Sequence, residues 1–195
     1  MTEQRSAGDA IPAQSEIIAV HVADTDRMFN AMDPAPFHDR DLDPNAETFI
    51  VEWSEDLPRH KPLALIVHLD RTPDIAADAA LLRDSVHRFF ANRAQAARRR
   101  LRDLLRRGRI SLAIGLAFLA AAIGASELAL QWFNPGGMIG VLRESLLIGG
   151  WVALWRPLEI FLYDWWPIRG EARLYDRLAV MPVRASEASG AAQSR

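Results

Sequence analysis

The hydrophobic pattern changes along the chain, from short apolar runs in the first half to long ones in the second. Two short runs, EIIAVHVA at 16–23 and LALIVHL at 63–69, are rich in β-branched residues and are flanked by polar or turn residues. Continuous apolar runs of this length are typical of strands buried on both faces of a sheet. The pattern therefore predicts two buried strands.

Each predicted strand is followed by a stretch with a helical period. In residues 43–57, Asp43 suits the cap position and Pro44 the first helical turn. The face predicted to be buried consists of Ala46, Phe49, Ile50, Trp53 and Leu57. A second helix is predicted to start near Pro73, capped by Thr72 or Asp74, and no breaker interrupts it before Gly108.

The resulting β-α-β-α order predicts an α/β fold with parallel strands joined by a crossover helix. Two strands alone leave open edges and are marginally stable. We therefore expect this domain to complete its sheet by self-association or against another chain.

Two longer apolar runs follow. Residues 110–130 form 21 residues with a single charge, Glu127, and about 20 apolar residues suffice to cross a hydrocarbon core of about 30 Å. The second run, 139–155, has 17 residues, close to the minimum for a span. The segment QWFNPGG, 131–137, contains helix breakers and joins the two. The pattern predicts a two-helix transmembrane hairpin.

Arg156, Pro157 and Glu159 interrupt the end of the second run. Proline lacks an amide donor and disfavours helical geometry in the residue before it, so the second span is predicted to end at Arg156. An interfacial helix would then follow, with its tryptophans at headgroup depth. In the alternative, the helix continues and Arg156 pairs with Glu159 inside the bilayer.

The predicted organisation has five parts. They are a disordered tail at 1–15, a cytoplasmic α/β domain at 16–92, an arginine-rich helical stalk at 93–109, a membrane hairpin with its exit segment at 110–166, and a cytoplasmic C-terminal helix with a disordered tail at 167–195.

Charge adds an orientation. Residues 1–80 hold 16 acidic against 6 basic side chains, and residues 81–195 hold 9 against 17. Residues 98–109 carry seven arginines, whereas the turn between the spans carries none. The positive-inside rule then predicts a multi-pass protein of the bacterial inner membrane with both termini in the cytoplasm.

Arginines beside a span are expected to bind anionic lipid headgroups rather than nucleic acid. The residues expected at the membrane surface or in contact with lipid are Arg106, Arg107, Arg109, Trp132, Trp151, Trp155, Arg156, Glu159, Trp165 and Trp166.

Candidate chemistry is sparse. His21 and His68 lie late in the two strands, followed by Asp24 and Asp70, so four polar side chains are expected near the strand ends where open α/β sheets bind ligands. A metal site or an acid/base pair is one interpretation. Strand histidines with turn-capping aspartates are favoured, since no HxxH or HExxH spacing occurs. His38, Asp39 and Asp41 are weaker candidates for cation ligands.

The chain has no cysteine and no GxGxxG, Walker A or GxSxG pattern, so we predict no cofactor, infer no catalytic activity and favour a protein that is not an enzyme. The favoured function is an interaction or assembly domain tethered to the membrane, as a homo-oligomer or with a partner membrane protein. One alternative is a membrane-tethered enzyme or metal-binding sensor using the strand-end histidines and aspartates. Another is a small oligomeric transporter or channel component using Glu127, Arg143 and Glu144.

Overall fold

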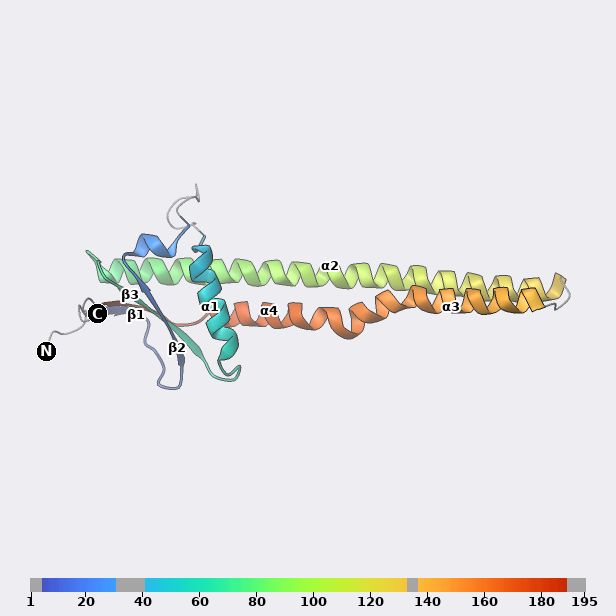
Figure 1. Cartoon of the computed structure of the whole chain (residues 1–195). Helices are drawn as coiled ribbons and strands as arrows, with labels where there is room; N and C mark the ends of the chain where they lie inside the picture. The colour runs from blue at the N-terminus through green and yellow to red at the C-terminus, as the bar shows by residue number, and fades with distance from the viewer. Residues whose placement is uncertain (1–4, 31–40, 133–136, 189–195) are drawn as a thin grey trace, which may run out of the picture. The chain divides into compact units, whose positions relative to one another are not determined.

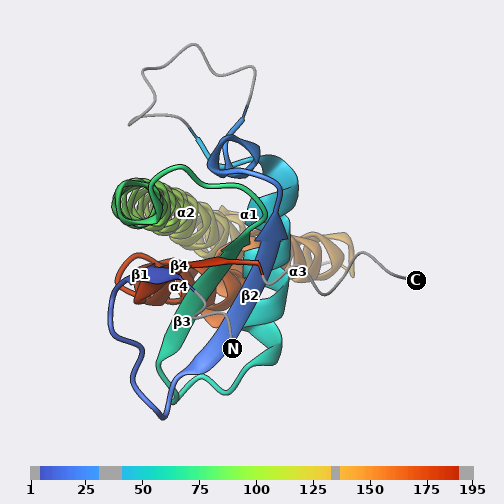
Figure 2. The same cartoon turned by 90° about the vertical axis from the view of Figure 1, so that its left-hand side faces the viewer.

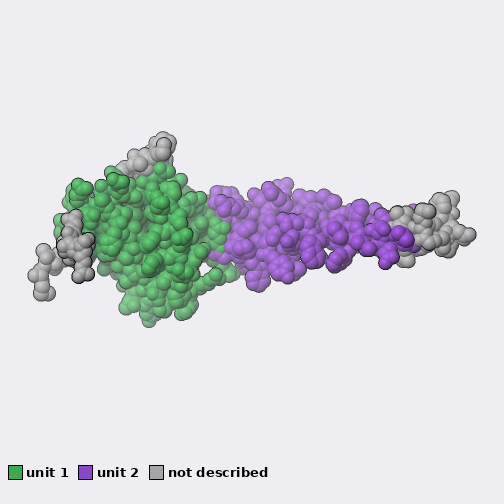
Figure 3. Space-filling view, viewed as in Figure 1, with its two compact units in different colours: residues 1–95, 171–195 green, residues 96–170 purple. Residues whose placement is uncertain are grey.

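The computed structural model describes residues 5–30, 41–132 and 137–188. The chain divides into two compact units (Figure 3): unit 1 comprises residues 1–95 and 171–195, and unit 2 comprises residues 96–170. Unit 1 is a mixed α/β unit with a four-stranded sheet, and unit 2 is helical.

Unit 1 is built on a sheet with the strand order β1-β4-β3-β2 (Figures 1 and 2). β2, β3 and β4 are parallel neighbours, and β1 pairs with β4 in the antiparallel direction. The elements of this unit are β1 (Ser6–Gly8), β2 (Glu16–Val22), the 3-10 helix η1 (Thr25–Met28), α1 (Pro44–Asp56), β3 (Leu63–Leu69), the first part of α2 (Ile75–Trp132), the last part of α4 (Trp165–Leu178) and β4 (Val183–Glu187).

The core of unit 1 lies on one face of the sheet. Alternate residues of β3, from Leu63 to Leu69, are fully or almost fully buried, and Ile18 of β2 is buried beside them. They pack with apolar side chains from the three helices, among them Ile50 of α1, Leu82, Val86 and Phe90 of α2, and Leu178 of α4. Ile17, on the other face of β2, is 48% exposed. Side chains on the second face of the sheet are therefore available for contacts outside the core.

Two of the four strands were not predicted, since one lies in the tail predicted to be disordered and the other in the segment predicted as a helix with a disordered tail. β1 lies within residues 1–15, and β4 within 167–195, so the expectation of a two-stranded sheet was wrong. β4 has the sequence VRASE, which contains no apolar run. Its stability comes from its position between β3 and β1, where Val183 and Ala185 are completely buried. Partners so distant in sequence leave no local signal.

Helix α1 starts as predicted, because the Asp43 carboxylate accepts a hydrogen bond from the backbone N–H of Asn45 at 2.9 Å. Its predicted buried face was partly wrong. Phe49 and Trp53 are 40% and 50% exposed and stack on each other with ring centroids 5.7 Å apart. Ser54 is buried in their place, and its hydroxyl donates to the Val51 carbonyl at 2.7 Å. A small side chain at this position lets the helix approach the core closely.

Polar contacts hold together the parts of α1, α2 and α4 that belong to unit 1. Arg93 of α2 pairs with Glu47 of α1 at 2.6 Å, while its guanidinium lies 5.0 Å from the Phe89 ring centroid. His87 Nε2 hydrogen bonds with the Met181 carbonyl at 2.7 Å. Arg177 of α4 donates to the Lys61 carbonyl at 2.9 Å, and burial, followed by the charge of Arg59, lowers the pKa of Arg177. The ion pair and the two hydrogen bonds join segments more than 40 residues apart in sequence.

Unit 2 contains the rest of α2, α3 (Gly137–Glu159), the π-helix η3 (Ile160–Asp164) and the start of α4. Glycines set the spacing of α2 and α3. Gly115 lies against Leu154, and Gly150 lies against Leu119, where an added Cβ would stand 2.6 Å from Leu119 Cδ1. Small residues at such contacts let two helix backbones approach closely, as in membrane helix pairs.

Two helical segments are long and apolar enough to cross a membrane, Ile75–Leu128 and Glu144–Leu178. In the apolar 18-residue stretch of each segment, only 17% is buried inside the molecule. Their apolar side chains therefore remain mostly uncovered by the chain itself.

Replacing Phe90, the largest completely buried side chain, should destabilise unit 1 strongly. We expect Phe90→Ala to lower the free energy of unfolding by about 3–5 kcal/mol, because it removes buried contacts and leaves a cavity. The matched change at a partly exposed position, Phe49→Ala, should cost about 0.5 kcal/mol. Hydrogen exchange of β3 amides in the full chain, measured across a urea series in detergent, compares the two. Equal losses of protection would show that the core does not depend on Phe90.

Candidate functional site

The structure brings His21 and His68 together. β2 and β3 pair so that the two residues are direct neighbours, and their rings stack with centroids 4.4 Å apart and planes 21° from parallel. The pair lies on the sheet face opposite the core, and Ser186 of β4 continues the same row beside His68. Burial, and secondarily the charge of His21, lowers the pKa of His68, because the protonated ring would lose hydration and face a second cation.

The two aspartates predicted to join the histidines have other contacts. The Asp24 carboxylate caps η1 and accepts from the backbone N–H of Arg27 at 3.3 Å. Asp70 directly follows β3, and its backbone N–H donates to the Val22 carbonyl at 3.2 Å. Among the residues the structure describes, no group of three or more His, Cys, Asp or Glu side chains is arranged to hold a metal ion. The structure thus brings the imidazole rings of His21 and His68 together, without a third such ligand beside them among the described residues.

Of the three weaker candidates for cation ligands, the structure describes only Asp41. His38 and Asp39 lie outside the described residues. Asp41 adjoins a short antiparallel bridge between Phe29 and Leu42, and its carbonyl accepts from the backbone N–H of Asn30 at 2.9 Å.

Unit 2 contains a cluster of charged side chains centred on Arg156. The guanidinium lies 2.8 Å from a Glu159 oxygen, as the spacing predicted, and 3.6 Å from an Asp164 oxygen, which the sequence analysis missed. In a regular helix, residues eight apart are rotated by about 80° from each other. The wider turn of η3, Ile160–Asp164, changes that rotation and brings Asp164 to Arg156. A π turn cannot be read from composition, so this partner left no sequence signal.

Pro157 does not end the helix, contrary to the prediction. It lies inside α3, and helical geometry continues through η3 into α4. Proline leaves the carbonyl of Ala153, four residues earlier, without its helical donor. That carbonyl faces Gly115 of α2, where an added Cβ would lie 3.3 Å from its oxygen. The defect is thus enclosed by the neighbouring helix, which is how irregular membrane helices are tolerated.

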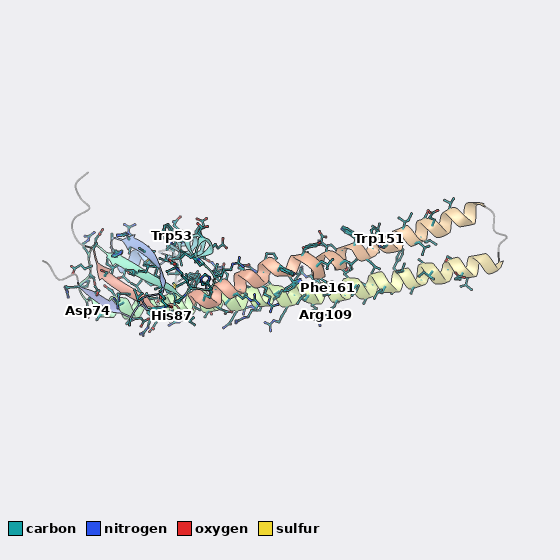
Figure 4. The ribbon with its side chains drawn as sticks, turned by 90° about the horizontal axis from the view of Figure 1, so that it is seen from below. Trp53, Asp74, His87, Arg109, Trp151 and Phe161 are labelled. Atoms are coloured by element: carbon teal, nitrogen blue, oxygen red, sulfur yellow. The ribbon has the colours of Figure 1, made fainter. Side chains whose placement is uncertain are left out.

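The helix contacts place the charged cluster along the hairpin. Leu154 contacts Gly115, and Ile160 and Phe161 contact Gly108. Arg156 and Glu159 therefore lie beside the segment of α2 between Gly108 and Gly115, where the apolar run begins. Figure 4 shows Phe161 close to Arg109, at the end of the arginine-rich segment.

The remaining residues predicted to meet lipid are mostly on the surface of the helices. Arg106, Arg107 and Arg109 are exposed. Three of the tryptophans are well exposed: Trp151 is 63%, Trp155 59% and Trp166 64% exposed. Trp165 is half-buried, with its indole N–H donating to the Phe161 carbonyl at 2.9 Å and the Arg169 guanidinium 5.4 Å from its ring centroid. Trp132 is the last residue of α2.

The polar residues of the transporter alternative lie at the other end of the hairpin. Glu127 and Glu144 are exposed on α2 and α3, and the side chain of Arg143 lies outside the described part of the structure. No ion pair between the two glutamates and a described basic residue is observed. They remain candidates by sequence position alone.

The His21–His68 pair predicts a pH-dependent stability of unit 1. Because the folded pKa of His68 lies below its ordinary value of 6.5, the unfolded chain binds more protons below that pH. This contribution to stability is full above pH 6.5 and is lost as the pH falls through the folded pKa. Hydrogen exchange of β3 amides in the full chain at pH 7.5 and 5.5, corrected for intrinsic exchange, should reveal the loss.

The change with pH should be smaller in His68→Asn than in the wild type, and intermediate in His21→Asn. His60→Asn, at an exposed position outside the sheet, is the control and should retain the wild-type change. An identical response of all three variants would assign the pH dependence to other groups.

The described residues thus form two groups of candidate side chains, the stacked histidines of unit 1 and the Arg156 cluster of unit 2. Comparisons with known proteins give no relative: no family model matches the chain, and no curated protein or solved structure is significantly similar to it.

Proposed function

We propose that the chain is a two-pass protein of the bacterial inner membrane whose cytoplasmic α/β unit acts by association rather than by catalysis. The observation that carries the proposal is the uncovered apolar surface of two adjacent helices. Side chains such as Ile114, Val141 and Ile148 are 65%, 65% and 59% exposed. Exposed apolar surface on this scale needs lipid or protein to cover it.

Arginine supports the orientation. Seven arginines lie between residues 98 and 109, directly before the first apolar run, and the segment between α2 and α3 has none. Basic residues beside a span remain in the cytoplasm. Unit 1, which contains residues 5–95 and 171–188 of the described chain, is then cytoplasmic, and the segment between α2 and α3 is outside.

Unit 1 also has apolar surface of its own. The stacked pair Phe49–Trp53 projects from α1, and Ile17 is exposed on β2. Within the described residues β2 is the last strand in the sheet and has a strand neighbour on one side only. An open edge and exposed aromatic rings are both typical of interfaces. A second copy of the chain is the occupant we propose, with a partner membrane protein as the alternative.

A metal-binding sensor is the second candidate, favoured by the neighbouring positions of His21 and His68 on paired strands, although their stacked rings would have to turn for both to reach one metal ion. Two imidazoles supply two of the four ligands of a usual zinc site, so the remaining ligands would come from a second chain or from water. Zinc binding that requires both histidines would favour this function over simple association.

Membrane insertion can be tested by single-cysteine labelling, because the chain has no natural cysteine. In intact spheroplasts, an impermeant maleimide should label Asn134→Cys, and it should label Gln95→Cys only after permeabilisation. Ile114→Cys should resist the reagent in membranes, although Ile114 is 65% exposed in the isolated molecule, and react after denaturation. Labelling of Ile114→Cys in native membranes would contradict insertion, and reversed labelling of the other two would contradict the orientation.

Association through α1 predicts an effect of its exposed aromatic pair. In light scattering of the detergent-solubilised chain, we expect the wild type to be an oligomer. The double variant Phe49→Ser with Trp53→Ser should raise the dissociation constant of this oligomer at least tenfold, because interface aromatics dominate binding. Val180→Ser is the control, since Val180 is 76% exposed and lies between α4 and β4 rather than on α1. A wild-type chain that stays monomeric over a wide concentration range would exclude self-association.

A further inference from the structure

An apolar groove of about 650 Å³ runs along the surface of unit 2, between α2 and α3. Its α2 side includes Arg107, Ser111, Ile114 and Phe118, and its α3 side includes Gly149 and Val152. This volume lies within the range of small-molecule sites, about 300–1,000 Å³.

Missing side chains open the groove. Gly149 lies in its lining, and a Cβ built at this position meets no atom within 4 Å. Gly150, the next residue, makes the tight contact with Leu119. Gly150 therefore lets α2 and α3 pack closely, and Gly149 leaves space beside that contact.

The groove is polar at one end and apolar along the rest. Arg107, Ser111, Ile114 and Phe118 recur at intervals of four, three and four residues, so they form one stripe along α2. Arg107 is exposed, and no described residue forms an ion pair with it. The stripe thus runs from a free cation, past a hydroxyl, to aliphatic and aromatic side chains.

The Ala153 carbonyl, which faces Gly115 in the lining, is a further polar group beside the groove. Ala153 lines the groove, and Pro157 deprives its carbonyl of the usual helical donor. The apolar length of the groove lies in the segment of the helices proposed to cross the membrane. The groove thus has the polarity of a phospholipid, with charge at the arginine-rich end and hydrocarbon beyond it.

We propose that this groove binds one anionic phospholipid, with its phosphate on Arg107 and an acyl chain along Ile114, Phe118 and Val152. The proposal rests on the membrane insertion proposed above. Charge complementarity selects this occupant, because guanidinium groups bind phosphate by paired hydrogen bonds and an acyl chain matches the apolar lining. A helix from a second copy is the competing occupant.

Native mass spectrometry of the full chain in detergent, with phosphatidylglycerol or phosphatidylcholine of identical acyl chains added, tests the headgroup site. We expect phosphatidylglycerol to bind about fivefold more tightly, the effect of one arginine on an anionic lipid. Arg107→Gln should abolish this preference. Arg106→Gln, its exposed neighbour outside the groove, should retain it.

Two glycine substitutions test the apolar part. Gly149→Leu should fill the groove without a clash and weaken binding of both lipids severalfold. Gly140→Leu is the matched control: its Cβ also meets nothing within 4 Å, it lies on the same helix, and it is not part of the groove lining. Binding should be unchanged in this variant.

Equal effects of Arg106→Gln and Arg107→Gln, or of the two glycine variants, would overturn the proposal and indicate non-selective lipid contact. Disulfide-linked dimers of Ile114→Cys that form in membranes and block lipid binding would assign the groove to a second copy. Extraction of the wild-type chain from membranes by alkaline carbonate would instead refute membrane insertion. Resistance to extraction without lipid preference would refute only the groove site.

Discussion

The continuity of helix α2 is the constraint on which the rest of the structure depends. It runs from Ile75 to Trp132 without a break and belongs to both units. Its surface must therefore satisfy different surroundings in succession. In unit 1 one stripe packs on the sheet, with Leu82, Val86 and Phe90 fully buried and polar residues elsewhere. Beyond the arginines the helix is apolar on all sides, which is stable only where lipid or protein replaces water.

The pairing of α3 with α2 shows how a local defect is compensated across an interface. Pro157 frees a carbonyl in α3, and Gly115 of α2 supplies the space in which that carbonyl lies. The π turn that follows brings Asp164 to Arg156, so the charge of the guanidinium is shared by two carboxylates. Pro157, Gly115 and the Arg156 cluster are thus parts of one arrangement, although the sequence gives no link between them. A break at the proline would have separated them.

Elements with strong local patterns could be predicted, and those defined by distant partners could not. The two apolar runs became β2 and β3, and the cap and helical period of residues 43–57 became α1. Even the alignment of His21 with His68 followed from their similar places in the strands. β1 and β4 were missed because their stability depends on pairing between the ends of the chain. Asp164 and the groove were missed because each requires the geometry of two turns or two helices.

The exposed apolar surfaces of the two units match different surroundings, lipid in one case and protein in the other. On α2 and α3 the exposed apolar side chains have few charged neighbours, and arginines lie at one end, which suits an anionic bilayer. On α1 the exposed Phe49–Trp53 pair is accompanied by Glu52, Glu55 and Asp56, all exposed. Carboxylates repel an anionic membrane surface, so lipid is a poor cover for these rings. A protein surface with basic or polar groups around an apolar centre matches them better, and this supports the proposal of association over membrane docking for the aromatic pair.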